Sequence, residues 1–227
     1  MGDPEKSLPP TSEQTLEYYP FQVKGYQGTF PKRKLLVLQT VDAREANNLN
    51  PTPLDSKPPV GVVTGLSENV IQKIYAAPLG PTLQSALARS AEEAGFIASA
   101  EAVSAYDPDS GRRADYVITS RIVRCWVKKH RGPNGRGGNP TWSTAGDFSI
   151  KVAVYKPPFK APFWEATSSD TYYDPPIGAY GLGPEDEAGV YDQPGQVLSV
   201  ALTRAVAGVF ERQDFRELVS EDHVISR

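Results

Sequence analysis

The sequence is poor in the residues that build disulfide, metal and acid–base sites. Its 227 residues include one cysteine, one methionine and two histidines. The single Cys125 excludes an internal disulfide and any zinc site that needs paired cysteines. His130 and His223 have no Ser, Cys or carboxylate at the spacing of a catalytic motif, so neither predicts a triad. We therefore expect no cofactor, no metal site and no enzymatic activity.

Positive charge and long apolar runs are also scarce. Lys and Arg number 24 against 27 Asp and Glu, which leaves a formal charge of −3. Binding to phosphate backbones needs a basic surface, so a nucleic-acid partner is not expected. No run of about 18 apolar residues occurs, and the N-terminus lacks the charged and then apolar stretch of a signal peptide. We expect the chain as given to be soluble.

Proline and glycine, in contrast, are abundant, with 21 and 19 residues that cluster between patterned segments. This predicts long irregular connections within a single domain over residues 34–220. Residues 1–33 are polar and rich in proline, which indicates an N-terminal tether, and residues 221–227 form a tail. The second half of the tether should lie against the domain, as a sheet-edge cover or a binding motif, because it holds five aromatic residues: Tyr18, Tyr19, Phe21, Tyr26 and Phe30.

Hydrophobic patterning predicts the elements of the first half of the domain. The apolar run over residues 34–41 is typical of a central strand covered on both faces. Residues 46–59 are expected to be a solvent-facing loop, followed by a short strand over residues 60–64. A proline near the start and a glycine after the end predict a helix over residues 79–94, and a short strand follows it in the chain. One face of this helix should pack on the sheet: Leu79, Leu83, Ala86, Leu87, Ser90 and Ala94.

The second half reads as a meander followed by a helix. Residues 115–129 are rich in β-branched and aromatic residues, which predicts a long strand. A glycine-rich flexible tip connects it to a second strand over residues 141–156, and residues 161–171 form a third strand. Asp192 and Pro194 should start a second helix, with a short helical tail around residues 215–219. The inner face of the second helix is expected to hold Val197, Leu198, Ala201, Leu202, Ala205 and Val209.

Together these elements predict an α+β fold, with a mostly antiparallel sheet, a three-strand meander and two main helices packed on one face. Strict alternation along the first meander strand gives two mixed faces, so we expect this strand to run past the edge of the core. One face would hold Val117, Thr119, Arg121, Val123, Cys125 and Val127, and the other Tyr116, Ile118, Ser120, Ile122, Arg124, Trp126 and Lys128.

Two segments are candidates for partner contact. The first is the hairpin tip, which holds four cations: Lys128, Lys129, Arg131 and Arg136. These cations could bind anionic lipid headgroups or an acidic partner, or they could simply lie in solvent. A loop over residues 172–195 holds four tyrosines, which either offer contact area or pack on their own sheet: Tyr172, Tyr173, Tyr180 and Tyr191.

A catalytic role could be considered for Asp42, Arg44 and Cys125, but a structural role explains each of them more simply. Asp42 and Arg44 follow a strand two residues apart, and such a pair braces the next loop by a salt bridge. Cys125 lies within a predicted strand, where a cysteine behaves as a small buried hydrophobic residue.

The order of short motifs resembles that of the YajG-like bacterial lipoproteins and, more distantly, of auxiliary lipoproteins of ABC transporters. The motifs are Val41-Asp42-Ala43-Arg44, Gly61-Val62-Val63, a helix ending at Gly95-Phe96, Ala114-Asp115-Tyr116, a meander and a final helix. The resemblance covers residues 34–220 and implies an N-terminal cysteine that is acylated and anchored in an envelope membrane, more often the outer one. No such cysteine lies near the start of this chain. The resemblance implies no catalytic residues.

Two functions follow from these observations. The first is a non-catalytic, periplasm-facing lipoprotein domain that acts as a protein-interaction or scaffold module. The second is an auxiliary lipid- or solute-binding subunit of an envelope ABC-type transport system, in which an apolar groove between helix and sheet would hold the ligand.

Overall fold

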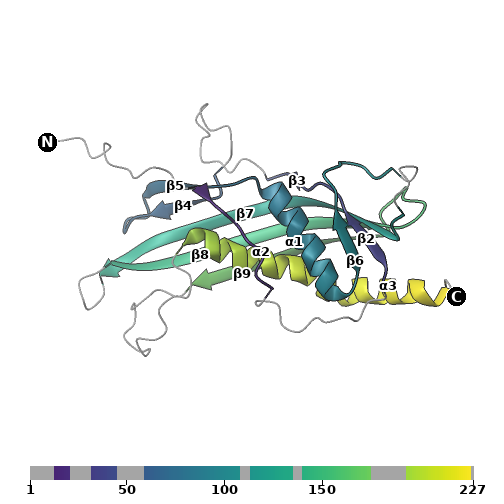
Figure 1. Ribbon diagram of the computed structural model, residues 1–227. Coiled ribbons are helices and arrows are strands. Elements are labelled where there is room, and N and C mark those ends of the chain that lie inside the picture. The colour runs from purple at the N-terminus through teal and green to yellow at the C-terminus, as the bar shows by residue number, and fades with distance from the viewer. Residues whose placement is uncertain are drawn as a thin grey trace.

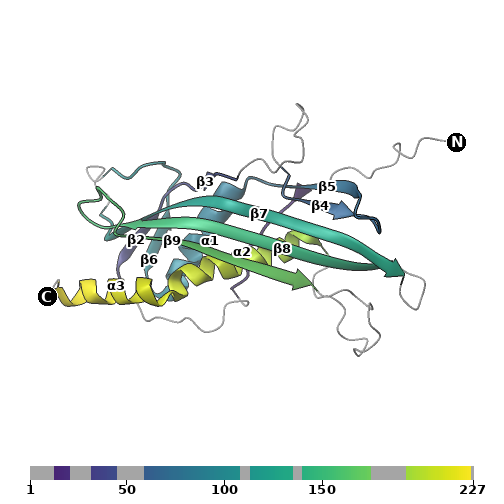
Figure 2. The same cartoon turned by 180° about the vertical axis from the view of Figure 1, so that it is seen from behind.

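The computed structural model describes residues 13–20, 32–44, 59–107, 113–134, 140–174 and 193–225. It contains one long curved sheet with the helices on one face, so the predicted α+β fold is confirmed (Figures 1 and 2). We call this the helix face and the opposite one the outer face. In chain order the elements are β1 (Glu13–Gln14), β2 (Lys34–Val37), β3 (Val41–Asp42), β4 (Gly61–Thr64), β5 (Val70–Ala76), α1 (Leu79–Ala94), β6 (Ile97–Ala100), β7 (Tyr116–Asn134), β8 (Pro140–Tyr155), β9 (Trp164–Asp174), α2 (Pro194–Glu211) and α3 (Gln213–Ile225).

Strand β7 organises the sheet. Along one edge it pairs in succession with three short parallel strands, β2, β3 and β4. Its other edge pairs with β8 along an antiparallel ladder, and β8 pairs with β9 in the same way, which confirms the predicted meander. β2 lies between β7 and β6 and is buried on both faces, as expected for a central strand. The sequence did not predict β5, which pairs with β4 and with β1.

A β-bulge between Ile122 and Arg124 resets the alternation of side chains along β7. The extra residue shifts the pattern by one position, so inward positions are even-numbered before the bulge and odd-numbered after it. The buried core positions of β7 follow this order: Tyr116, Ile118, Ile122, Cys125 and Val127. The predicted faces, which kept a single alternation and placed Cys125 opposite Tyr116, were therefore wrong.

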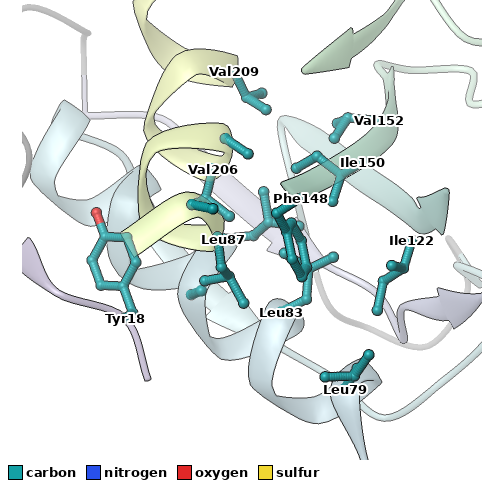
Figure 3. Packing of buried hydrophobic residues seen from close by; sticks show 14 of the residues in the cluster. Tyr18, Leu79, Leu83, Leu87, Ile122, Phe148, Ile150, Val152, Val206 and Val209 are labelled. Atoms are coloured by element: carbon teal, nitrogen blue, oxygen red, sulfur yellow. The ribbon is translucent and has the colours of Figure 1, made fainter. Parts of the chain in front are cut away.

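Helix α1 has the predicted bounds and buries every residue of the predicted face. It ends at Gly95, whose φ of 108° lies in the left-handed region that glycine adopts without strain. The amide of Phe96 then donates to the Ala91 carbonyl, which satisfies one of the last carbonyls of the helix. Figure 3 shows the result, in which Leu83 and Leu87 of α1 meet Phe148 of β8 in the centre of the core.

Helix α2 begins at Pro194 as predicted, but its N-cap is Gln193 and not Asp192. Gln193 and Gln196 exchange side-chain and backbone hydrogen bonds in a capping box. The predicted inner face of α2 is buried against β8 and β9. Gly146 of β8 allows this close approach, because a Cβ atom there would lie 3.0 Å from Val197 Cγ1. The predicted short tail is the full helix α3.

Residues 13–20, which we call the N-terminal strap, lie within the predicted tether but belong to the packed structure. Leu16 and Tyr18 are buried against the helix layer, with exposures of 5% and 8%. The Tyr18 hydroxyl donates to Glu93 Oε2 of α1 at 2.7 Å. The described aromatic residues therefore lie against the helix layer, while the sheet edge at β5 pairs with β1, which contains no aromatic residue. The strap does not behave as a tether over these residues.

Two buried hydroxyls of α2 hold the backbone of the strap. The amide of Glu17 donates to Ser199 Oγ at 2.9 Å, and that of Tyr19 donates to Thr203 Oγ1 at 2.8 Å. Each hydroxyl in turn donates to the carbonyl four residues earlier in α2. The spacing of the two amides matches the spacing of the two hydroxyls, because two residues of extended chain and one turn of helix both span roughly 6 Å.

Several predicted segments lie outside the described residues, including almost all of the 46–59 loop, residues 175–192 and the hairpin tip at 135–139. No helix in the described part of the chain is long and apolar enough to cross a membrane.

Replacing Thr203 by valine should loosen the strap. The change keeps the side-chain shape but leaves the Tyr19 amide without its acceptor, which should lower the free energy of unfolding by about 1–2 kcal/mol. Urea unfolding measures this loss, and hydrogen exchange of the Tyr19 amide should become faster. Thr203→Ser keeps the hydroxyl and is the matched control. Equal Tyr19 exchange in the two variants would contradict the role of this hydrogen bond.

Asp214, at the start of α3, should titrate far below an ordinary aspartate. Arg212 donates two hydrogen bonds to its carboxylate, and with smaller contributions from Trp164 and the Phe215 amide this lowers the pKa of Asp214 to about 2. Because the pKa in the folded state is lowered, the stabilisation is complete above the unfolded value near pH 4 and is lost as the pH falls towards 2. A carboxyl NMR titration should give a midpoint near 2, and Arg212→Gln should move it back towards an ordinary value. An unchanged midpoint in that variant would contradict this cause.

Candidate functional site

The register of the meander brings residues of the two candidate segments together on the outer face. In one row across the sheet, Lys128 of β7 faces Ala145 of β8, which faces Tyr173 of β9. The next row holds Trp126, Asp147 and Thr171. We call Trp126, Lys128, Ala145, Thr171 and Tyr173 the outer patch. Tyr173 is 69% exposed, the largest exposure among the described large hydrophobic side chains.

A hollow of about 750 Å³ adjoins the patch. It lies where the edge of β7 has no strand partner among the described residues, because β3 pairs only up to Ile122 and β4 pairs only from Val127. Apolar side chains line part of it: Val62, Val70, Val123 and Trp126. Its charged lining consists of Arg44, Glu68, Arg124 and Lys128. Each of these cations is paired with a carboxylate, Arg44 with Asp42, Arg124 with Asp147 and Lys128 with Glu68, so the rim is charged but balanced.

Ion pairs hold the charged side chains of this region in place. Arg124 donates to Asp147 Oδ2 at 2.8 Å, while the Thr171 hydroxyl donates to Asp147 Oδ1 at 2.7 Å. This network links all three strands of the meander on the outer face. Lys128 Nζ lies 3.6 Å from Glu68 Oε2, with both side chains largely exposed. Such exposed pairs contribute little to stability, so Lys128 can exchange its partner at small cost.

The predicted salt bridge after β3 is confirmed, while the loop it was expected to brace lies outside the described residues. Arg44 donates to both carboxylate oxygens of Asp42, at 2.8 and 2.7 Å. Burial raises the pKa of Asp42, but the hydrogen bonds and charge of Arg44 outweigh it and lower the pKa below its ordinary value. Cys125 is buried with 1% exposure, also as predicted, and lies close enough for Arg44 to influence its pKa.

The other predicted contact residues that the structure describes lie away from the outer patch. Tyr172 belongs to β9 rather than to a loop and points to the helix face, where the Arg204 guanidinium lies 5.0 Å from its ring centre. Lys129 also points to the helix side of the hairpin, with Nζ 5.4 Å from the ring centre of Trp142. Arg131 pairs across the hairpin with Trp142. Tyr180, Tyr191 and Arg136 lie outside the described residues.

Sequence reasoning missed Trp126, Ala145 and Thr171 as members of the patch. They come from three strands, and only the strand register places them side by side. His130 is partly buried and shares a 2.9 Å hydrogen bond between Nδ1 and Thr64 Oγ1. The described part of the chain contains no group of three His, Cys, Asp or Glu side chains arranged to hold a metal ion.

No family model matches the chain, and a search of curated proteins finds no relative. Solved structures do share its fold. A Xanthomonas campestris protein of the family DUF330 superposes with a TM-score of 0.50 at 12% identity, over 94% of this chain and 99% of that one. The likeness at this identity concerns the fold alone.

Two further structures are more distant. A putative neuraminyllactose-binding hemagglutinin homolog from Helicobacter pylori gives a TM-score of 0.43 at 10% identity, over 90% of this chain and 97% of that one. A hypothetical protein from Chlamydia trachomatis gives 0.39 at 11% identity, over 83% and 97%. The solved structures thus include bacterial proteins of uncharacterised families, and membership of the YajG-like family stays a prediction.

Cys125 should be inert towards thiol reagents while the chain is folded. Burial raises the pKa of its thiol to about 12, against a partial lowering by Arg44, so almost no thiolate is present near neutral pH. A disulfide reagent should react slowly with the native protein and at once in denaturant. Thr167→Cys is the control, because it adds an exposed thiol that should react at once in the folded state. Rapid labelling of native Cys125 would contradict its placement in the core.

Proposed function

We propose that this chain is a non-catalytic domain of a bacterial cell-envelope protein that binds a protein partner through the outer patch. The observation that carries the proposal is the row Lys128, Ala145 and Tyr173, in which a cation and an exposed tyrosine flank a small residue on one sheet face. Tryptophan and tyrosine are enriched at protein contact surfaces, and the outer patch holds one of each, Trp126 and Tyr173.

The envelope location is supported by the sequence resemblance to YajG-like lipoproteins, and the bacterial DUF330 protein has the same fold. On this proposal the anchor is a lipid on a cysteine that precedes the given sequence. The partner would then be another envelope protein, and a lipid surface could lie close by.

The packing gives less support to an acyl-chain carrier. In the described residues, the space between α1, α2 and the sheet is filled by side chains with exposures of 0–9% (Figure 3). The hollow beside the outer patch has a charged rim, which suits a polar surface better than a hydrocarbon chain. Lipid transport therefore remains the alternative, to be tested by native mass spectrometry of the extracted protein.

The partner-binding proposal can be tested by photo-crosslinking in the bacterium that expresses the chain. A benzophenone amino acid in place of Ala145, at the centre of the patch, should give a discrete product with one envelope protein. The combined change Lys128→Glu and Tyr173→Ala in the same chain should reduce this product at least tenfold, roughly 1.4 kcal/mol of binding.

The control places the same crosslinker at Lys151. This residue lies on the same strand and the same face, about 20 Å along β8 from Ala145. The same product from both positions, or a product that persists in the Lys128 and Tyr173 variant, would overturn the proposal. Thermal unfolding of each variant should show that the fold is retained.

A further inference from the structure

Strand β9 is the long free edge of the sheet. It spans 11 residues and pairs only with β8 in the described part of the chain. The opposite edges belong to short strands, the four-residue β6 and the two-residue β1. Free edges expose unpaired backbone donors and acceptors, and proteins usually protect them by shortness, proline, charged side chains, a bulge or a covering element. β9 contains no proline and no lysine, and its ladder with β8 has no bulge. Its charged residues are the three acids Glu165, Asp170 and Asp174.

If the β9 strands of two copies pair antiparallel about a two-fold axis, one register is favoured. An antiparallel pair centred on Ser169 overlaps all 11 residues, because Ser169 is the middle of the strand. Centring on Asp170 would place two aspartates directly opposite each other, which is repulsive. An antiparallel pair centred on Ser168 overlaps fewer residues and adds no favourable side-chain contact.

The side chains are complementary in the Ser169 register. Thr167 lies opposite Thr171 of the second copy, and Glu165 lies opposite Tyr173, so no two like charges meet. On the helix side, Ser168 of the second copy lies opposite Asp170. Asp170 Oδ1 is buried without a hydrogen-bond partner among the described residues, and its nearest cation, Arg204 Nη1, is 3.9 Å away. In this register the Ser168 hydroxyl of the second copy would supply the missing donor.

We propose that two copies of this chain associate through β9, antiparallel and centred on Ser169, to form one continuous sheet. An 11-residue antiparallel pair makes on the order of ten interstrand hydrogen bonds, the number found in an ordinary specific interface. The inference does not rest on the proposed function. The outer patch stays on the open face of the joined sheet, where Thr171 and Tyr173 lie beside Thr167 and Glu165 of the second copy.

Cysteine substitutions test the register directly. Ser169→Cys places two thiols opposite each other at a Cα separation of about 4.5–5.5 Å, within the range of a disulfide. Mild oxidation should therefore give a covalent dimer. Thr167→Cys alone should remain monomeric on a non-reducing gel, whereas a mixture of Thr167→Cys and Thr171→Cys should give the mixed dimer. Failure of Ser169→Cys to crosslink, or equal crosslinking of Thr167→Cys alone, would overturn the register.

The unmodified chain should be a dimer in light scattering and sedimentation at micromolar concentration. Ser169→Lys would place two ammonium groups opposite each other and should weaken dimerisation by at least about tenfold. Ser169→Thr keeps a neutral hydroxyl and is the matched control. Ser169 is exposed, so neither change should alter thermal unfolding of the monomer. A monomeric parent chain, or a Ser169→Lys variant that dimerises like the parent, would overturn the proposal.

Discussion

The fold depends on the pairing of β7 along both of its edges. One edge is shared by β2, β3 and β4, which come from separate parts of the first half of the chain, and the other holds the meander. The helices cover only the side where the inward residues of β7 and β8 form a continuous apolar surface. Because the bulge keeps that surface continuous along a 19-residue strand, one core can serve the whole molecule.

Much of this fold could be predicted from the sequence, because the elements have clear local patterns. Helix α1 carries a strong apolar stripe and a glycine stop, and its bounds were predicted to the residue. The bulge could not be predicted, since no residue type in Ile122-Val123-Arg124 identifies it and only pairing with β8 creates it. Strand β5 was missed because its alternation is weak and its stability depends on pairing with β4. The contact of Tyr18 and Tyr19 with the domain was predicted, but the place where the strap lies was not, because its partners in α2 are at the other end of the sequence.

The candidate site could be predicted only in part, because its residues come together through strand pairing. Lys128 and Tyr173 were identified separately, one as a hairpin cation and one as a loop tyrosine, but their common row depends on a register spanning three strands. Tyr172 and Tyr173 show how much one position matters, because neighbours in a strand point to opposite faces. One tyrosine therefore packs beneath Arg204, while the other lies in the open.

The N-terminal strap has a consequence for the order in which the protein reaches its final form. Its hydrogen bonds to α2 join residues 182 and 184 positions apart in the chain. During synthesis the strap leaves the ribosome before β5 and α1, and long before α2. It can meet β5 and α1 while the chain is still growing, but its backbone hydrogen bonds to α2 must wait for that helix. The amides of Glu17 and Tyr19 thus lack their acceptors in α2 until translation is almost complete.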